Sequence, residues 1–563
     1  MLVVIGYNRA FFETSYFERQ IGMHRVQRAI ISVSDKTGVV ALAKQLHELG
    51  IQILSTGGTS TVLKQNGIPV TEVSQFTGFP EIMDGRVKTL QPKIHGGILA
   101  VRDNPEHVQQ MKTHNIEAID LLIINLYPFE ATIQKPGVTF EEAIENIDIG
   151  GPAMLRSAAK NHAFVGVVVN PNHYERLLSE LKANQNSLTA EFKRELAIEV
   201  FETTSMYDGM IANYLKKQSN LEGLRDHISL GLKKVVACRY GENPHQEGAL
   251  YELKQSYESG LPSAEQLGGK ELSYNNLMDL SAAFSMARDF AEPTVVIIKH
   301  GNPCGLSSAP DIETALLHAW SGDPMSAFGS VIGINRKVTA SLAEKLGSRE
   351  FLEELVLPKF RKESGLEVNV LAAFVEAIIA PDFDLEALDI LRRKKNLRIM
   401  KQPNFMPQNI EKGLQFRSVP GGMLVQSCDF GLVKPSDYKI TTELRPSAEQ
   451  LVSLAFADKV AKHVKSNAIV LVQGTTLVGA GAGQMSRFDS CKIAAEKAGK
   501  RAKGAVLASD AMFPSRDGVD AAVQTGAIAI IQPGGSIRDE EVIAAANEYK
   551  IPMVFTGMRH FLH

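Results

Sequence analysis

An abrupt change from apolar to reactive residues occurs in the segment 295–305, which reads VVIIKHGNPCG. Four aliphatic residues, as in a buried strand, end directly at Lys299 and His300, and turn-forming residues follow. Histidine suits general-base chemistry because its ordinary pKa lies near neutrality, and a neighbouring lysine can stabilise a developing oxyanion. The alternative is a histidine that caps the strand end and donates a hydrogen bond to a backbone carbonyl.

Three polar segments earlier in the chain have the residue types of anion-binding loops. The segment 54–60 (LSTGGTS) joins a predicted strand to a predicted helix, so its glycines allow close approach of a ligand and the helix N-terminus favours phosphate. Arg86 and Lys88 are two residues apart, which places both cations on one face of an extended chain. The segment 34–37 (SDKT) follows the first strand directly. Together they predict an anionic substrate, although a capped glycine turn and a solvated basic face explain the first two separately.

Two further groups combine charged, amide and hydroxyl side chains with turn-forming residues. In the first half of the chain these are the segments 125–128 (NLYP) and 148–152 (DIGGP), after which residues 156–160 are predicted to begin a helix. Lys160 in that helix is, by itself, explained as a lysine on a helix surface. In the second half, the segment 239–246 (RYGENPHQ) gathers a cation, an aromatic ring, amides and an imidazole, a mixture that packing alone rarely requires.

Two motifs that resemble cofactor sites lack a required residue. The segment 479–483 (GAGAG) is similar to a dinucleotide-binding loop, but Gln484 stands where G-x-G-x-x-G requires its third glycine. Pro303 and Cys304 resemble half of a zinc-deaminase motif, but Ser307 replaces its second cysteine, and no H-x-E precedes it nearby. The sequence therefore predicts neither a nicotinamide cofactor nor a catalytic metal.

Alternating strands and helices must position these residues. Residues 28–34 are predicted as a strand, 38–50 as a helix and 51–55 as a second strand, with another helix to about residue 66. Further strands are predicted within 120–129 and 163–169. Strands that alternate with helices in this way indicate βαβ units on a doubly wound parallel sheet.

The rest of the chain is also predicted to be α/β. The polar segment 215–227 loses periodicity and is the preferred linker, and the following residues alternate apolar strand candidates with helices. A charged, weakly periodic stretch at 390–413 predicts that this second region divides into two α/β parts.

Size and composition exclude several classes of protein. The chain has 563 residues, enough for about three or four domain-sized units, with 44% hydrophobic and 22% charged residues. A net charge of −3 argues against non-specific nucleic-acid binding, and the apolar runs are far shorter than the roughly 18 residues of a membrane helix. Four scattered cysteines without a C-x-x-C pair favour a reducing, cytosolic setting. Residues 1–22 have no basic region before their apolar start, so they are interpreted as an extension rather than a secretory signal.

The order of motifs along the chain resembles one family. From residue 28 onward the sequence is similar to the bifunctional purine biosynthesis proteins that join phosphoribosylaminoimidazolecarboxamide formyltransferase to inosine monophosphate (IMP) cyclohydrolase. The motifs that carry the resemblance include SVSDKTG, STGGTS, TGFPEIMDGRVKTLQPKIHGGIL, NLYPFE, IDIGGPAMLRSAAKNH, RYGENPHQ, ELSYNNLMDLSAAF, KHGNPCG, SNAIVLV, GAGAGQMSR, SDAMFPSRDGVD and GMRHF.

The resemblance implies a fold and two reactions. It implies an N-terminal extension at 1–23, a methylglyoxal-synthase-like cyclohydrolase domain at 24–220, and a formyltransferase region of two cytidine-deaminase-like subdomains at 221–563. The formyltransferase would move a formyl group from 10-formyltetrahydrofolate to the amine of aminoimidazole carboxamide ribonucleotide. The cyclohydrolase would then close the ring with loss of water. The implied partners are purine-precursor ribonucleotides, reduced folate and a second copy in a cytoplasmic homodimer, without nucleic acid or membrane.

The resemblance also implies roles for individual residues. His300 would take a proton from the amine, Lys299 would stabilise the transition state, and Lys160 would transfer a proton in the cyclohydrolase. The other catalytic candidates are Asn467, Asp148, Tyr127 and Lys88. The substrate-binding candidates are Ser34, Lys36, Ser55, Thr56, Gly57, Gly58, Arg86, Thr89, Asn125, Arg239, Tyr240, Gly329, Glu376, Arg487 and Arg559. The folate-binding candidates are Phe488, Met512, Asp517, Ser536 and Ile537.

The sequence departs from the family at a few positions, and other functions explain parts of it. Met512 stands where the family often has Phe, with Phe513 adjacent, so weaker folate binding is expected. Cys238 and Phe488 also differ from the commoner residues and are expected to be packing variants. The alternative function is a phosphate-sensing regulatory module fused to a deaminase-like, nucleotide-modifying enzyme. Such a module accounts for the first domain but leaves Lys299 and His300 without a purpose.

Overall fold

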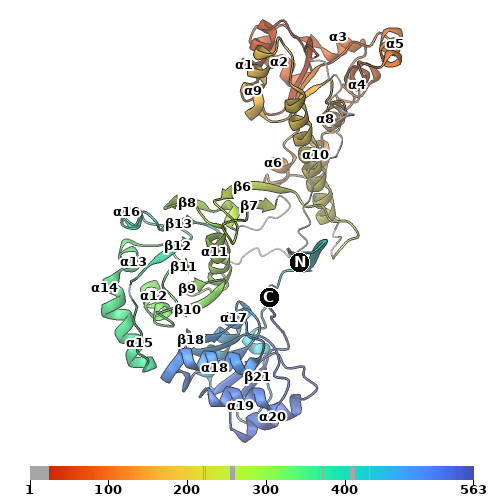
Figure 1. Cartoon of the computed structure of the whole chain (residues 1–563). Helices are drawn as coiled ribbons and strands as arrows, with labels where there is room; N and C mark the ends of the chain where they lie inside the picture. Colours follow the sequence, from red (N-terminus) through yellow and green to blue (C-terminus); the bar gives the residue numbers. More distant parts are fainter. Residues whose placement is uncertain are drawn as a thin grey trace, which may run out of the picture. The chain divides into compact units, whose positions relative to one another are not determined.

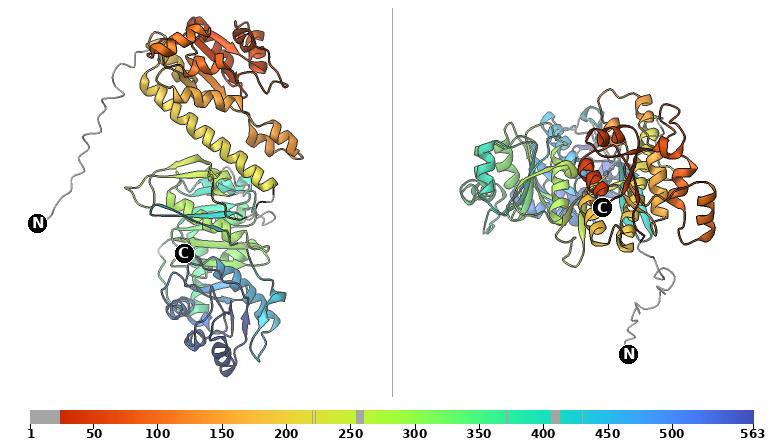
Figure 2. Two further views of the ribbon diagram at one scale, coloured as in Figure 1. Left: turned by 90° about the vertical axis from the view of Figure 1, so that its right-hand side faces the viewer. Right: turned by 90° about the horizontal axis from the view of Figure 1, so that it is seen from above.

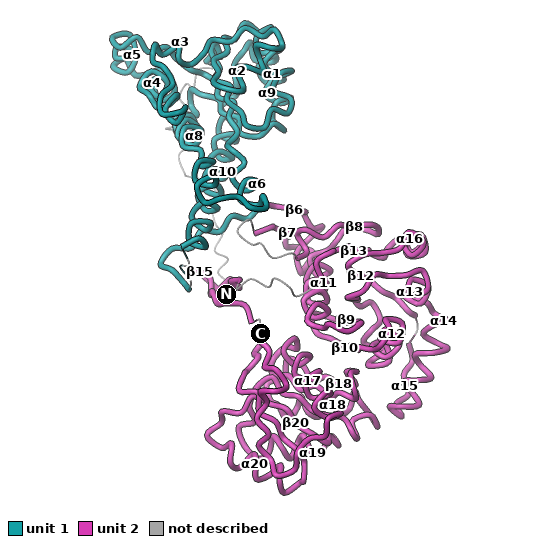
Figure 3. The backbone as a smooth tube through the Cα atoms, turned by 180° about the vertical axis from the view of Figure 1, so that it is seen from behind, with its two compact units in different colours: residues 1–232 teal, residues 233–563 magenta. Residues whose placement is uncertain are grey.

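The computed structural model describes residues 24–219, 221, 223–253, 260–370, 372–405, 413–429 and 431–563. The predicted extension at 1–23 lies outside these residues. The chain forms two compact units, Met1–Leu232 and Lys233–His563 (Figures 1 and 3), and each is described by itself.

Unit 1 is built on a five-stranded parallel sheet in the order β3-β2-β1-β4-β5. Its strands are β1 (Arg28–Val33), β2 (Gln52–Ser55), β3 (Thr71–Glu72), β4 (Leu121–Asn125) and β5 (Gly166–Val168). Its helices are α1 (Val39–Glu48), α2 (Gly57–Gln65), α3 (Val73–Thr77), α4 (Pro92–Leu99), α5 (Pro105–Thr113), α6 (Phe129–Ile133), α7 (Phe140–Glu145), α8 (Gly150–Lys160), α9 (Tyr174–Ala183) and α10 (Ala190–Gln218).

Both faces of this sheet are buried, which is why its strands are continuous apolar runs. Ala29 and Ile31 pack on one face with α1, α9 and the start of α10, whereas Ile30 packs on the other face with α4 and α8. The predicted doubly wound sheet is thus present. The predicted linker at 215–227 begins later than expected, because α10 continues to Gln218 as one long helix, yellow in Figure 2.

Unit 2 is built on a twelve-stranded mixed sheet in the order β16-β21-β20-β19-β17-β18-β10-β9-β11-β12-β13-β8. The strands of its first half are β8 (Glu265–Gly268), β9 (Thr294–Lys299), β10 (Asn302–Ser308), β11 (Ser330–Ile334), β12 (Val375–Ala380) and β13 (Arg398–Lys401). Those of the second half are β16 (Lys439–Ile440), β17 (Ile469–Gln473), β18 (Thr476–Gly481), β19 (Val506–Ser509), β20 (Ala529–Gln532) and β21 (Met553–Phe555). Each half repeats one pattern: an antiparallel hairpin, three further strands, and a short antiparallel edge strand.

The two halves are joined through the sheet itself. The hairpin strands β10 and β18 pair antiparallel at Ser307 and Thr476, so the division expected near 390–413 does not interrupt the sheet. One apolar core beneath α11 and α17 runs across both halves, while the opposite face has a separate core in each. The helices are α11 (Tyr274–Ala287), α12 (Ile312–Trp320), α13 (Ala340–Lys345), α14 (Arg349–Phe351), α15 (Leu357–Ser364), α16 (Leu385–Arg392), α17 (Ala448–Lys462), α18 (Arg487–Ala498), α19 (Arg516–Gln524) and α20 (Asp539–Glu548).

Two hairpins form small sheets of their own, β6 (Leu232–Cys238) with β7 (Gly248–Leu253) and β14 (Leu414–Val419) with β15 (Gly422–Ser427). Within the described residues, none of the helices is both long and apolar enough to traverse a lipid bilayer.

Candidate active sites

The candidate residues of unit 1 meet at the carboxyl edge of its sheet, because β1, β2 and β4 are parallel and end there. Asn125, the last residue of β4, fixes the loop after β1. Its Oδ1 accepts hydrogen bonds from the backbone N–H groups of Ser34 (2.6 Å) and Asp35 (2.9 Å), and its Nδ2 donates to the Asp35 carbonyl. Asn125 therefore shapes the loop that carries Lys36.

The segment between β2 and α2 provides backbone donors beside this loop. Gly57 has a φ of 48° and opens α2, and the Thr56 side chain caps none of the first-turn N–H groups. A Cβ on Gly58 would lie 4.0 Å from the Lys36 ammonium, so a lysine stands next to the helix N-terminus. The Ser55 side chain is buried, and its hydroxyl donates to the Ile31 carbonyl at 2.6 Å within the sheet. Helix N–H groups and one cation together make an anion-binding site.

Asp148 is a half-buried acid at this edge. Its Oδ1 accepts the Gly151 N–H at 2.8 Å, and its own N–H donates to the Tyr207 hydroxyl at 2.8 Å. Burial raises the pKa of Asp148, and the backbone N–H groups of Gly151 and Tyr127 and the Lys88 ammonium oppose that rise. Such a carboxyl, with a cation close by, can accept and return a proton.

Thr89 and Arg86 flank Lys88 in different ways. Thr89 is buried, and its hydroxyl oxygen would stand 2.8 Å from a Cβ at Gly150, so only glycine fits there at the start of α8. Arg86 is exposed and forms an ion pair with Glu145 of α7. The structure thus brings Lys88, Thr89, Tyr127 and Asp148 together, with Arg86 at their exposed side.

Lys160 is not among these residues. It is exposed at the last position of α8, and ten residues of helix rise, about 15 Å, separate it from Gly150. The sequence predicted that this helix begins near residue 156, but it begins at Gly150. The proton-transfer role that the resemblance implies for Lys160 stays a prediction.

In unit 2, Lys299 and His300 lie at a tight hairpin turn. Lys299 pairs with Asn302 across β9 and β10, so His300 and Gly301 form the turn. Their φ values are 52° and 74°, the left-handed conformation that a type I′ turn requires at both central positions. Asn or Gly is usual at the first of these. A histidine held there, with its side chain exposed, favours a chemical role over a strand cap.

The Lys299 ammonium is held by two carbonyls of the neighbouring strand-end loop. It donates to Phe328 O at 2.7 Å and Gly329 O at 3.1 Å. Gly329 has a φ of 66°, a left-handed conformation that favours glycine, and a Cβ there would lie 3.2 Å from the ammonium. The Gly301 N–H donates to Asp279 Oδ1 at 2.7 Å and fixes the turn from α11.

Sheet pairing brings Asn467 to the same place. The Asn302 side chain accepts the Lys465 N–H at 3.0 Å, which joins the His300 turn to the segment before β17. Asn467 donates from Nδ2 to the carbonyls of Gln484 (2.9 Å) and Met485 (3.1 Å) after β18. Asn467 is thus positioned by Gln484 and Met485, which follow the glycine-rich end of β18.

Arg487 and Arg559 meet on an aromatic ring. Their guanidinium carbons lie 5.9 Å and 4.4 Å from the centre of the Phe561 ring. Arg487 also forms an ion pair with the buried carboxylate of Asp510 at 3.1 Å. Two cations on one exposed ring make a surface suited to an anionic, planar ligand.

The remaining ribonucleotide candidates of unit 2 lie on other elements. The Glu376 carboxylate on β12 forms an ion pair with Arg398 of β13 at 2.5 Å. Arg239 and Tyr240 follow β6, where the guanidinium donates to the Tyr240 hydroxyl at 3.2 Å. Within the described part of the chain, neither a hydrogen bond nor an ion pair joins these three residues to His300.

The folate candidates lie on or beside α18, α19 and α20, and all but the half-buried Ser536 are exposed. Met512 is 37% exposed whereas Phe513 is 0% exposed, so the adjacent phenylalanine cannot replace the aromatic ring missing at Met512. Ser536 N–H donates to Asp539 Oδ1 at 3.0 Å, and Ile537 beside it is fully exposed. Asp517 and Phe488 are the other two folate candidates. The Asp517 carboxylate accepts the Ser515 hydroxyl, and the centre of the exposed Phe488 ring lies 4.4 Å from the Lys492 ammonium.

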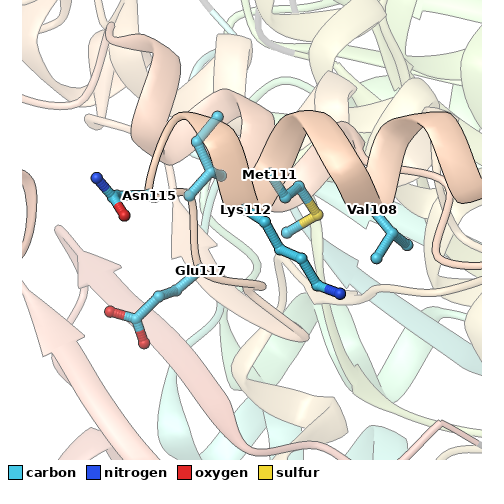
Figure 4. A pocket seen from close by; sticks show the side chains of 6 residues that line it. Val108, Met111, Lys112, Asn115 and Glu117 are labelled. Carbon is cyan, nitrogen blue, oxygen red and sulfur yellow. The ribbon is translucent and has the colours of Figure 1, made fainter.

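A shallow pocket on unit 1 lies away from these groups. Val108, Met111 and Lys112 of α5 line it with the following loop (Figure 4). That loop leads into the start of β4, whereas the candidate residues lie at the other end of the strand, so the pocket contributes nothing to the site.

Several positioning residues were not foreseen from the sequence. Arg398 contacts Glu376, Asp510 and Phe561 contact Arg487, and Asp279 contacts Gly301 beside His300, in each case between residues distant in the sequence. Asp279, Asp510 and Phe561 lie inside the motifs ELSYNNLMDLSAAF, SDAMFPSRDGVD and GMRHF, which were the only signal available for them.

Comparison with known proteins gives a consistent result. A family model described as "AICARFT/IMPCHase bienzyme" matches residues 158–369 and 366–497, and an "MGS-like domain" model matches residues 38–153. The Bifunctional purine biosynthesis protein PurH of Acetivibrio thermocellus is 49% identical over 96% of this chain and 100% of its own length. The chain belongs to the AICARFT/IMPCHase bienzyme family. PurH of Bacillus mycoides is similarly close, at 50% identity over 95% of this chain and 100% of its own length.

Membership of this family confirms the predicted fold class and activity. The chain is a bifunctional enzyme of purine biosynthesis with formyltransferase and IMP cyclohydrolase activities. A solved structure, "Crystal structure of ForH", matches 33% of this chain and 97% of its own, with 34% identity and a TM-score of 0.30.

Proposed function

We propose that the two reactions are divided between the two units at the residues described above. Residues 24–220 would carry the cyclohydrolase and residues 221–563 the formyltransferase. The observation that supports this proposal is that candidate residues gather around Asp148 in one unit and around His300 in the other. The substrates would be aminoimidazole carboxamide ribonucleotide and 10-formyltetrahydrofolate, and the product inosine monophosphate.

In the formyl transfer, His300 is the general base. Its exposed imidazole takes a proton from the substrate amine as the nitrogen attacks the formyl carbon, and the tetrahedral intermediate then expels N10 of the folate, which is protonated. Lys299, held by the carbonyls of Phe328 and Gly329, stabilises the negative oxygen of that intermediate. Arg487 and Arg559 bind the ribonucleotide anion, and Asn467 accepts a hydrogen bond from it through Oδ1, since its Nδ2 already donates to two carbonyls. The folate is held by the exposed group that includes Met512 and Ile537.

In the ring closure, Asp148 and Lys88 move the protons. Asp148 takes a proton from the carboxamide nitrogen as that nitrogen attacks the formyl carbon, and Lys88 gives a proton to the oxygen of the adduct. The hydroxyl then leaves as water with the proton that Asp148 returns, while the formamide nitrogen gives its proton to Lys88 as the C=N bond of the ring forms. The first turn of α2 and Lys36 bind the 5′-phosphate. The resemblance implies Lys160 for proton transfer. We favour Lys88, because Lys160 lies at the far end of α8 from Gly150.

The assembly and location are proposed from the resemblance: a cytoplasmic homodimer, with no resident metal or nicotinamide cofactor. The experiment that tests the division of labour, and the choice of lysine within unit 1, compares Lys88→Met and Lys160→Met in a cyclohydrolase assay on supplied formylated ribonucleotide, with formyl transfer by the same variants expected to be unchanged. Lys88→Met should lose about 10²-fold or more in kcat, the usual contribution of a proton-transfer group. A loss of this size for Lys160→Met, with Lys88→Met fully active, would show that Lys160 and not Lys88 serves the reaction.

A further inference from the structure

Residues 559–562 alternate between the candidate formyltransferase site and the protein interior. Arg559 and Phe561 are exposed and face one another, whereas His560 between them is 3% exposed. Leu562 is tied to the segment before Asn467, because its N–H donates to the Ser466 hydroxyl at 3.1 Å and its carbonyl accepts the Ser466 N–H at 2.8 Å. The buried imidazole is therefore the internal anchor of a segment that presents two side chains outward.

Acidic groups from separate elements face this imidazole. His560 Nδ1 lies 2.7 Å from Asp429 Oδ2, and the His560 N–H donates to the Asp510 carbonyl at 3.0 Å. Asp458 of α17 is 5% exposed, interacts electrostatically with His560 and bonds the Tyr438 hydroxyl.

Two buried polar atoms in this arrangement have no hydrogen-bond partner among the described residues. Within the described part of the chain, His560 Nε2 and Asp458 Oδ2 are both buried without a hydrogen-bond partner. Burial raises the pKa of Asp458 to about 6, and His560, Tyr438 and Lys462 oppose that rise. At the slightly alkaline pH of an assay the carboxylate is therefore mostly ionised and attracts the imidazole. Breaking the contact between His560 Nδ1 and Asp429 would leave a further buried polar atom without a partner, which is costly, so this contact holds the backbone of the segment in place.

We propose that His560 is a positioning residue for formyl transfer: clamped between Asp429 and Asp458, it holds residues 559–562 so that Arg559 stands against Phe561 and Arg487. The inference rests on the proposed place of Arg559 at the formyltransferase site. His560 touches no substrate; it acts through the two residues beside it. The Asp510 carbonyl accepts the backbone N–H of His560, and the Asp510 carboxylate pairs with Arg487. One residue therefore helps to position both arginines.

A double-mutant cycle tests this role in the full-length enzyme. The formyl-transfer kcat/KM for the ribonucleotide is measured for wild type, His560→Gln, Arg559→Ala and the double variant. His560→Gln should lose roughly tenfold, Arg559→Ala more, and the double variant no more than Arg559→Ala within about twofold, because both changes remove one interaction. The cyclohydrolase activity of each variant is the control within the same chain. His173→Gln is a matched control, since it removes an imidazole paired with Glu199 at 2.9 Å in unit 1, and should leave formyl transfer unchanged.

Each outcome decides a different point. If the losses of the two single variants multiply in the double variant, or if His560→Gln is fully active, His560 does not act through Arg559 and the inference fails. If Arg559→Ala itself is fully active, the proposed site assignment fails and the inference with it. If His560→Gln does not fold, Asp429→Asn weakens the same clamp from a half-exposed position, and the same cycle with Arg559→Ala gives the answer.

Discussion

Replacing His300 by Asn and by Ala separates the chemistry of this residue from its backbone conformation. A left-handed conformation costs an ordinary L-residue about 1–2 kcal/mol, whereas Asn tolerates it through local hydrogen bonding. With φ at 52° in the first position of a type I′ turn, Ala retains that cost and Asn followed by Gly301 forms the preferred pair. We therefore expect the Asn variant to exceed the Ala variant by roughly 1 kcal/mol in free energy of unfolding. Both variants remove the base, so formyl transfer should fall by about 10²–10⁴-fold.

The chain allows both quantities to be measured cleanly. Trp320 is its single tryptophan and is 2% exposed in the core of unit 2, so its fluorescence during urea titration reports the unfolding of that unit. Formyl transfer is measured as kcat with ribonucleotide and 10-formyltetrahydrofolate, and cyclisation of supplied formylated ribonucleotide by unit 1 is the control. Equal stabilities of the two variants would refute the conformational argument, and formyl transfer within about tenfold of wild type in either would refute the general-base role.

Three further predictions concern other residues. Asp148→Asn should lower the cyclohydrolase kcat by about 10²-fold and leave formyl transfer unchanged; a loss of both in a folded variant would contradict separate sites. Met512→Phe should lower the KM for the folate by about threefold to tenfold through ring stacking, and an unchanged KM would remove Met512 from the folate surface. Burial lowers the pKa of Lys193 to about 8 from an ordinary 10.5, so between these values the unfolded chain holds a proton that the folded chain has released. The stability of unit 1 should therefore rise with pH across this window relative to Lys193→Met, measured as the urea midpoint for loss of cyclohydrolase activity, and parallel curves would contradict it.

Much of the fold was predictable because its strands are buried on both faces. The predicted strand at 28–34 corresponds to β1 (Arg28–Val33) and the predicted helix at 38–50 to α1 (Val39–Glu48), since continuous apolar runs and helical periodicity both follow from burial. The start of α8 was misplaced because Gly150, Gly151 and Pro152 are poor helix formers, and packing in the unit overrides their propensity.

The sites were predictable as loops but not as contacts. The change from apolar residues to Lys299 and His300 marks a turn at a strand end, which the structure has. The pairing of β10 with β18, which brings Asn467 beside that turn, joins residues far apart in the sequence and leaves no local pattern. The burial of Phe513 beside exposed Met512 likewise depends on which way the loop faces its core, and adjacent positions in the sequence do not reveal it.

The central claim, that one chain carries two independent sites, is tested most directly by mixing two inactivated variants. Asp148→Asn and His300→Ala enzymes are combined with aminoimidazole carboxamide ribonucleotide and 10-formyltetrahydrofolate, and inosine monophosphate is followed over time. Neither variant alone should form the product, while the mixture should form it because each supplies the step that the other lacks. A mixture that forms no product, although each variant retains its own remaining reaction on directly supplied substrate, would contradict the claim.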